Sequence, residues 1–145
     1  MKYLKTYRLF ESDEVDYYNG LIKEDIEDMF IDISDMGFQV NVILSKRLVM
    51  VDKDWKIGNT RTTFGEIPYI EVRILPIRNP ILTSIDVLNR NQNMKSLNNS
   101  DDFKTLLDDV NHRISYNDWY VSESIVIQDI LKVLLHRKQD SKYIK

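Results

Sequence analysis

The chain has 145 residues, of which 43% are hydrophobic and 30% are charged, and it contains no cysteine. This composition excludes an intrinsically disordered chain, and the lack of cysteine excludes a disulfide framework, a cysteine-ligated zinc site and a cysteine nucleophile. The length is typical of one domain, and no apolar run approaches the ~20 residues of a membrane span. Residues 1–10 also lack the apolar stretch of a secretory signal, so we expect an intracellular protein.

Lysine and arginine number 20 and aspartate and glutamate 23, which gives a formal net charge of −3. The charges are segregated along the chain. Residues 11–35 contain ten acidic residues against Lys23 alone, whereas the segments 1–10, 46–61 and 132–145 are each net basic. A protein that coats nucleic acid usually has a net positive charge, so this balance does not favour a general nucleic-acid coat.

The first predicted element is a helix over residues 12–35. Apolar residues recur there at spacings of three and four, which places them on one face: Val15, Tyr18, Ile22, Ile26, Met29 and Ile33. Ser12 is suited to cap its start, although Asn19-Gly20 marks a break that would move the start to residue 20. Gly37 is expected to end the helix, because glycine adopts the left-handed cap conformation without a steric penalty.

The following segment is predicted to form an antiparallel meander of three strands. Alternating apolar residues indicate a strand over 38–44, a tight turn over 45–47 and a second strand over 48–51. Residues 52–65 are polar and predict a loop. A third strand over 69–75 follows Pro68, which suggests an edge or entry position.

The last third of the chain is predicted to be mainly helical. Pro80 is predicted to begin either a fourth strand or a short helix that uses Ile81, Leu82, Ile85 and Leu88. The asparagine-rich segment 89–99 predicts a surface loop. Ser100 is expected to cap a helix with a buried stripe of Phe103, Leu106, Leu107, Val110 and Ile114. A short strand over 116–121 and a final helix over 124–137 complete the pattern.

Together these elements predict an α+β fold in which a three- or four-stranded antiparallel sheet packs against an N-terminal helix and two C-terminal helices. Residues 1–11 form an N-terminal amphipathic segment in this prediction, 12–139 a single domain, and 140–145 a frayed tail.

No sequence motif for a metal, a nucleotide or a serine nucleophile is present. His112 is expected on a helix surface, and His136 at a helix C-terminus where a cation is favoured. The row Asp25, Asp28, Asp32 and Asp35 is interpreted as a solvated helix face, with a Mg²⁺ site as the alternative. We therefore expect no metal and no cofactor.

The predicted order helix–strand–strand–strand–helix–strand resembles the core of PD-(D/E)xK nucleases. Asp52 or Asp54 would follow the second strand, and Glu71 and Arg73 share a face of the third. The resemblance implies metal ions that activate water against a phosphodiester. Arg73 stands where the family has lysine and is too basic to give up a proton, and the same acid-x-basic spacing recurs elsewhere in the chain.

The predicted loop 52–64 contains aromatic and basic residues together. They are Lys53, Trp55, Lys56, Arg61 and Phe64. Such a mixture can stack on bases and hold phosphates, which makes this segment a candidate nucleic-acid-binding site. The alternative is that the two aromatic side chains cover the sheet edge while the lysines remain in water.

Residues 1–11, Met-Lys-Tyr-Leu-Lys-Thr-Tyr-Arg-Leu-Phe-Glu, resemble the start of small proteins of large tailed phages. They are similar to the capsid-targeting segments of internal proteins in T-even-type phages. A prohead protease cuts those segments after a Leu/Ile-x-Glu triplet, which Leu9-Phe10-Glu11 matches. The resemblance implies a phage origin and a processing site after Glu11.

We therefore predict a small phage-encoded accessory or virion-internal protein that acts by binding and not by catalysis. The expected partner is a protein, the expected location is the host cytoplasm, with packaging in the virion as an alternative, and no membrane is involved. The two alternative functions are a metal-dependent nuclease and a nucleic-acid-binding module through residues 52–64.

Overall fold

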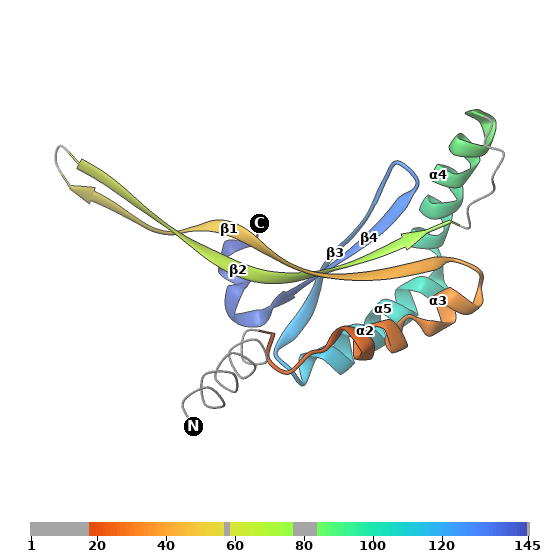
Figure 1. Cartoon of the computed structure of the whole chain (residues 1–145), viewed down its shortest axis with the longest axis horizontal. Helices are drawn as coiled ribbons and strands as arrows, with labels where there is room; N and C mark the ends of the chain where they lie inside the picture. The colour runs from red at the N-terminus through yellow and green to blue at the C-terminus, as the bar shows by residue number, and fades with distance from the viewer. Residues whose placement is uncertain (1–17, 57–58, 77–83, 145) are drawn as a thin grey trace, which may run out of the picture.

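The computed structural model describes residues 18–56, 59–76 and 84–144. Its four strands form one antiparallel sheet in the order β1-β2-β4-β3 (Figure 1). In chain order the elements are α2 (Lys23–Met29), α3 (Ile31–Asp35), β1 (Gln39–Lys56), β2 (Asn59–Leu75), α4 (Ser84–Asn99), α5 (Asp101–Ser115), β3 (Trp119–Ile127), β4 (Ile130–Arg137) and the 3-10 helix η1 (Lys138–Tyr143). The predicted α+β fold with an antiparallel sheet is confirmed.

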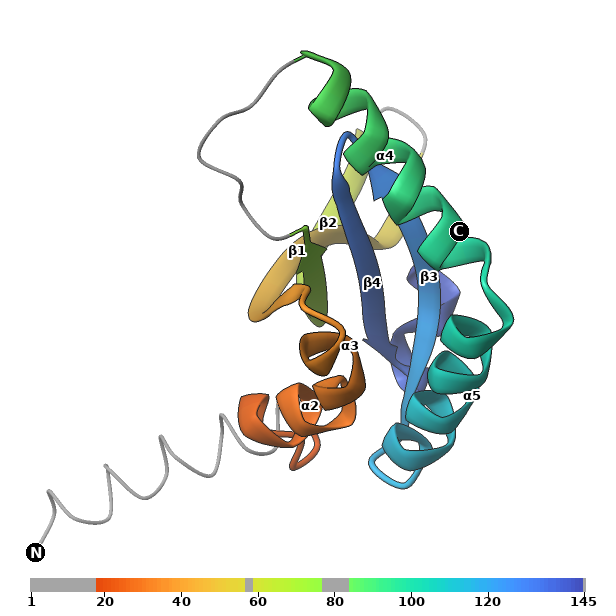
Figure 2. The ribbon, with the colours of Figure 1, turned by 90° about the vertical axis from the view of Figure 1, so that its right-hand side faces the viewer.

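The core lies between one face of the sheet and the helices. Alternate residues of the two central strands point to this face and are buried, among them Ile70, Val72, Leu131 and Val133. Helices α2 and α3 pack against β1, whereas α4 and α5 pack against β3 (Figure 2). Burial of these side chains in one continuous cluster is the main driving force for the fold.

The N-terminal helix is shorter than predicted and is interrupted. Residues 12–17 lie outside the described part of the chain. The predicted break at Asn19-Gly20 is confirmed, because both residues have positive φ angles, of 54° and 82°. A second interruption at the buried Phe30 separates α2 from α3.

Gly37 ends α3 as predicted, with φ 98°. Its N–H donates to the carbonyl of Ser34, and the N–H of Phe38 donates to Ile33. This is the Schellman arrangement, which satisfies the last carbonyls of the helix and turns the chain into β1.

The predicted turn over 45–47 and the loop over 52–65 are wrong. β1 runs unbroken from Gln39 to Lys56, and its pairing with β2 continues to Lys56 opposite Asn59, with a β-bulge between Met50 and Asp52. Within the described residues, only β1 and β2 pair with each other over this stretch, because β4 pairs with β2 only over Tyr69–Ile74. Polarity alone therefore did not indicate the absence of a strand.

The predicted surface loop over 89–99 is also wrong, because these residues belong to α4. Met94 and Leu97 are buried in the core and hold the helix in place despite its poor helix formers. Residues 77–83, where Pro80 was expected to begin a helix or a strand, lie outside the described residues. The next helix matches the prediction: the hydroxyl of Ser100 accepts a hydrogen bond from the Phe103 N–H at 3.2 Å and caps α5.

The predicted helix over 124–137 is wrong, and the strand expected over 116–121 is longer than predicted. β3 and β4 form a hairpin whose turn contains Gln128 with φ 58°. Apolar residues in this segment fit a helical period, but Leu131, Val133 and Leu135 also alternate, and the sheet uses this second pattern. In the segment expected to fray, residues 140–143 belong to η1, and Asp140 is buried.

None of the described helices is both long enough and apolar enough to cross a membrane.

Candidate binding surface on the β1–β2 arm

The hairpin of β1 and β2 projects beyond the rest of the sheet (Figure 1). β4 pairs with β2 only from Ile74 back to Tyr69, whereas β1 and β2 continue to pair from Lys46 opposite Pro68 to Lys56 opposite Asn59. We call residues 46–68 the arm. Pro68, which cannot donate a backbone hydrogen bond, lies just past the end of the β4 pairing, where the sheet narrows from four strands to two.

One face of the arm exposes large apolar side chains. Leu48 is 64% exposed, Met50 50% and Phe64 58%. They share a face, because Leu48 and Met50 are two residues apart in β1 and Met50 lies directly opposite Phe64 in β2. We call these three side chains the arm patch. Leu44, at the base of the arm, is also exposed.

The opposite face of the arm is covered close to its base. Val49 and Ile67 point to that face and are buried, and η1 packs against β1. The two faces of one ribbon therefore differ: the protein buries the apolar residues on one face and leaves those on the other in water. Adjacent exposed apolar side chains of this size are typical of an interaction site.

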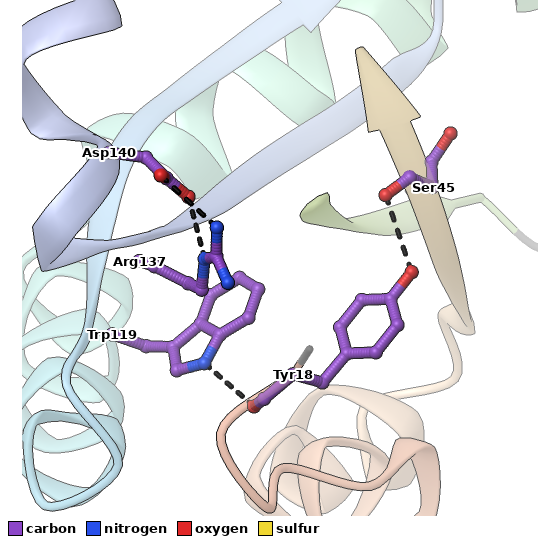
Figure 3. Close-up of polar contacts among 5 residues, drawn as sticks. All are labelled: Tyr18, Ser45, Trp119, Arg137 and Asp140. Carbon is purple, nitrogen blue, oxygen red and sulfur yellow. Dashed lines mark hydrogen bonds and ion pairs between the residues drawn. The ribbon is translucent and has the colours of Figure 1, made fainter. Parts of the chain in front are cut away.

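A set of buried polar contacts fixes the base of the arm to the body (Figure 3). The Tyr18 hydroxyl donates to the carbonyl of Ser45 in β1 at 3.4 Å, and Trp119 Nε1 of β3 donates to the Tyr18 carbonyl at 2.8 Å. Arg137 Nε and Nη2 donate to the two carboxylate oxygens of Asp140 at 2.6 and 3.1 Å. The rings of Tyr18 and Trp119 are stacked, with centroids 6.1 Å apart. The Tyr18 contacts link β1 to β3, and the Arg137–Asp140 pair links the end of β4 to η1.

The candidate nucleic-acid-binding residues all lie on the arm, in strands and not in the predicted loop. The register places Lys53 opposite Thr62, Trp55 opposite Thr60, Lys56 opposite Asn59 and Arg61 opposite Asp54. Their side chains are outside the described part of the chain. Phe64 is exposed. Residues 46–68 contain five basic and three acidic residues, so the arm is net basic by two charges on a chain of net charge −3.

The nuclease candidates do not come together. Glu71 lies opposite Ile43, whereas Asp52 lies opposite Thr63, nine residues further along β1, and Asp54 lies further still. At ~3.3 Å per residue this separation is on the order of 30 Å, too far for ligands of one metal ion.

Glu71 instead forms an ion-pair cluster. It is buried among two cations, with Arg73 Nε 3.0 Å from one carboxylate oxygen and Lys132 Nζ 3.5 Å from the other. Among the residues that the structure describes, no three histidine, aspartate or glutamate side chains are arranged to hold a metal. Asp25, Asp28, Asp32 and Asp35 are exposed, which agrees with the solvated-face interpretation.

The prediction for His136 is wrong. It lies in β4 and not at a helix terminus, and it is only 1% exposed. The Ser122 hydroxyl donates to the Leu134 carbonyl at 3.0 Å and lies 2.7 Å from His136 Nδ1, so the neutral ring donates its Nδ1 proton to Ser122. The rings of Tyr69 and Tyr120 flank the imidazole. Its Nε2 is buried without a hydrogen-bond partner in the described structure.

These surroundings keep His136 neutral. Burial, and secondarily the nearby charge of Arg47, lower its pKa from 6.5 to about 4, and Asp140 acts in the opposite direction. Burial, and secondarily Asp140, raises the pKa of the neighbouring Tyr120. His112, by contrast, is exposed on α5 as predicted.

The sequence analysis missed both the arm patch and the buried environment of His136. Leu48 and Met50 were assigned to a strand, but their exposure depends on where the helix layer ends. For His136, the available signal was an alternation typical of a strand. Lys132, Leu134 and His136 alternate there with Leu131, Val133 and Leu135. The processing candidates Leu9, Phe10 and Glu11 lie outside the described residues.

Comparisons of the chain with models of protein families, with curated proteins and with solved structures found no match.

Proposed function

We propose that this protein acts by binding another protein through the arm patch, and not by catalysis. The observation that carries the proposal is the exposure of Leu48, Met50 and Phe64 side by side on a ribbon that projects from the body. These side chains are each about half exposed, so burying the rest of them contributes roughly 3–5 kcal/mol before the cost of association. Methionine and phenylalanine are also enriched in protein–protein interfaces.

Site-specific photo-crosslinking tests the proposal. A photoreactive phenylalanine analogue at position 64 is expected to crosslink to a protein in cells that naturally make the chain. The matched control is the same analogue at position 116, because Tyr116 is an exposed aromatic residue that follows α5, away from the arm. Loss of the crosslink in Leu48→Glu would show that the patch itself binds. Equal crosslinking from positions 64 and 116 would contradict the proposal.

Nucleic acid is the second candidate partner. Its support is that Lys53, Lys56 and Arg61 all lie in a two-stranded ribbon, and such a ribbon fits the major groove of DNA. The expected behaviour is salt-dependent retention on DNA or RNA that Lys56→Ala and Arg61→Ala each weaken. Retention that does not change with salt or with these variants would remove this candidate.

We further propose that the chain is a phage-encoded accessory or virion-internal protein. The support is the resemblance of residues 1–11 to capsid-targeting segments. Cleavage after Glu11 would give a mature protein that begins at Ser12, which intact-mass spectrometry of purified particles would detect. A particle protein that retains Met1 would contradict the processing step.

A further inference from the structure

We propose that η1 is a strap over the base of the arm, and that protonation of His136 beneath it releases the strap and exposes Val49 and Ile67 to water. These two side chains lie on the face of the ribbon opposite the arm patch, so the proposal does not depend on binding through that patch. It rests on the position of η1, on the way η1 is attached, and on an unpartnered nitrogen of the buried imidazole.

η1 lies where β4 would otherwise continue alongside the arm. β4 pairs with β2 as far as His136 opposite Tyr69, and η1 begins two residues later at Lys138. Ile67, the next residue of β2 on the same face as Tyr69, is only 4% exposed, and Val49 is also buried. η1 packs against both β4 and β1, at the base of the arm (Figure 1). Movement of η1 away from the sheet would therefore expose these two apolar side chains.

η1 is attached to the body mainly through one side chain. Asp140 is its buried residue, and its two carboxylate oxygens accept hydrogen bonds from Arg137 at 2.6 and 3.1 Å. Four of the other residues of η1 are exposed, namely Lys138, Gln139, Ser141 and Lys142. A 3-10 helix of six residues with so few buried contacts is expected to open at a lower free energy than the central strands.

The imidazole of His136 has one nitrogen satisfied and one unpartnered. Nδ1 lies 2.7 Å from the Ser122 hydroxyl, whereas Nε2 is buried and has no hydrogen-bond partner among the described residues. Protonation turns Nε2 into a charged donor that needs an acceptor. Both oxygens of Asp140 already accept from Arg137, so the closed arrangement of the described residues offers Nε2 no acceptor. Water can satisfy the new N–H once η1 moves away.

The charges around the ring act in opposite directions. Arg47 of β1 opposes a positive charge on His136, whereas Asp140 of η1 favours it, and Asp140 is itself neutralised by Arg137. The exposed charged side chains of η1 and β3 are Lys138, Lys142 and Glu123. The remaining titratable side chains on this face are two phenols beside the ring and one carboxylate held by two cations: Tyr69, Tyr120 and Glu71. Burial and Arg47 together therefore keep the ring neutral while η1 is closed.

Opening depends on pH because the ring titrates differently in the two states. Beneath η1 the pKa of His136 is about 4, and in contact with water it returns to 6.5. Between these values the open state binds more protons than the closed state, so a fall in pH favours opening. From pH 7 to pH 5 the ratio of open to closed molecules is expected to rise roughly twentyfold.

A single introduced cysteine tests the proposal, because the chain contains none. Ile67→Cys places a thiol beneath η1, and Val110→Cys places one in the fully buried face of α5, which only unfolding of the domain exposes. The readout is the rate of labelling by a dipyridyl disulfide, which reacts at acidic pH. Division by the rate for the same variant unfolded in urea at the same pH gives the opening ratio, and circular dichroism shows that each variant is folded.

At position 67 the opening ratio should rise roughly twentyfold from pH 7 to pH 5. It should change little in low concentrations of urea, because release of η1 exposes little surface. At position 110 labelling should be slower and should depend strongly on urea.

Two substitutions in the Ile67→Cys background identify the titrating group. His136→Asn should remove the rise, whereas the matched control His112→Asn, at an exposed position, should keep it. Arg47→Gln, also at an exposed position, tests the proposal even where His136→Asn does not fold. Removing this cation moves the pKa of the covered ring toward 6.5, so the rise should become smaller.

Three results would overturn the proposal. They are an opening ratio at position 67 that is the same at pH 7 and pH 5, a rise that persists in His136→Asn, and labelling at positions 67 and 110 with the same rate and the same urea dependence. Binding through the arm patch has a separate readout, because crosslinking from position 64 at pH 7 does not require η1 to open.

Discussion

Protonation of His136 is expected to make the stability of this protein depend on pH between about 4 and 6.5. The folded state holds the neutral imidazole between Tyr69 and Tyr120 with its Nε2 unpaired, and its pKa is about 4. In the unfolded chain the pKa is 6.5. Between these values the unfolded state binds more protons than the folded state, so stability rises with pH. The contribution is fully present above pH 6.5 and is lost as the pH falls toward 4.

The size of the effect follows from the difference of about 2.5 pKa units. At 1.36 kcal/mol per unit, His136 lowers the free energy of unfolding by about 3 kcal/mol between pH 7 and pH 4. Little of this is screened by solvent, because the residue is almost completely buried. A loss of this size is a large share of the stability of a typical domain.

Urea unfolding followed by tryptophan fluorescence between pH 4 and pH 7.5 measures the effect. His136→Asn is the informative variant, because its amide can keep the hydrogen bond to Ser122 while the titrating ring is removed. Its unfolding free energy should be lower than that of the wild type at pH 7, and the difference should shrink by about 3 kcal/mol as the pH falls to 4. His112→Asn, at an exposed position, should follow the wild type throughout. Parallel curves for the wild type and His136→Asn would refute the reasoning.

Three further variants test the packing of the fold by thermal or urea unfolding. Ser100→Ala removes the hydroxyl that accepts the Phe103 N–H at the start of α5, so it should lower the free energy of unfolding by about 1 kcal/mol. Ser100→Asp should retain most of the stability, because its carboxylate can accept the same hydrogen bond. No loss of stability in Ser100→Ala would contradict the capping role. Gly37→Ala should cost about 1–2 kcal/mol, because an L side chain is strained at φ 98°, and an unchanged midpoint would argue against that strain. Trp119→Phe loses the hydrogen bond from Nε1 to the Tyr18 carbonyl, so it should lower the free energy of unfolding by about 1–3 kcal/mol. Stability equal to the wild type would mean that this contact does not hold the base of the arm.

Local signals in the sequence were sufficient for some elements. Ser100 with the stripe from Phe103 to Ile114 determined α5, and Gly37 determined the end of α3, because capping and helix termination depend on atoms within a few residues. Alternation over residues 69–75 identified the C-terminal part of β2. The α+β class followed from these elements together.

Other features depended on residues that are distant in the sequence. The segment 124–137 satisfied both a helical and an alternating period, and pairing of β4 with β2 and β3 decided in favour of the strand. Asparagine-rich α4 forms because Met94 and Leu97 are buried against the sheet. In both cases burial by tertiary neighbours outweighed weak local preference.

Candidate site residues show the same division. The sequence identified the basic and aromatic residues between 52 and 64 but not the strands that carry them, and it proposed a meeting of Asp52 with Glu71 that the register does not allow. The exposure of Leu48 and Met50, and the burial of His136, depend on where neighbouring strands and helices stop. Sequence by itself determined which side chains this protein possesses and where its clearest helix begins and ends. Tertiary structure alone decided which apolar residues remain in water, because burial is a property of contacts between segments that are far apart along the chain.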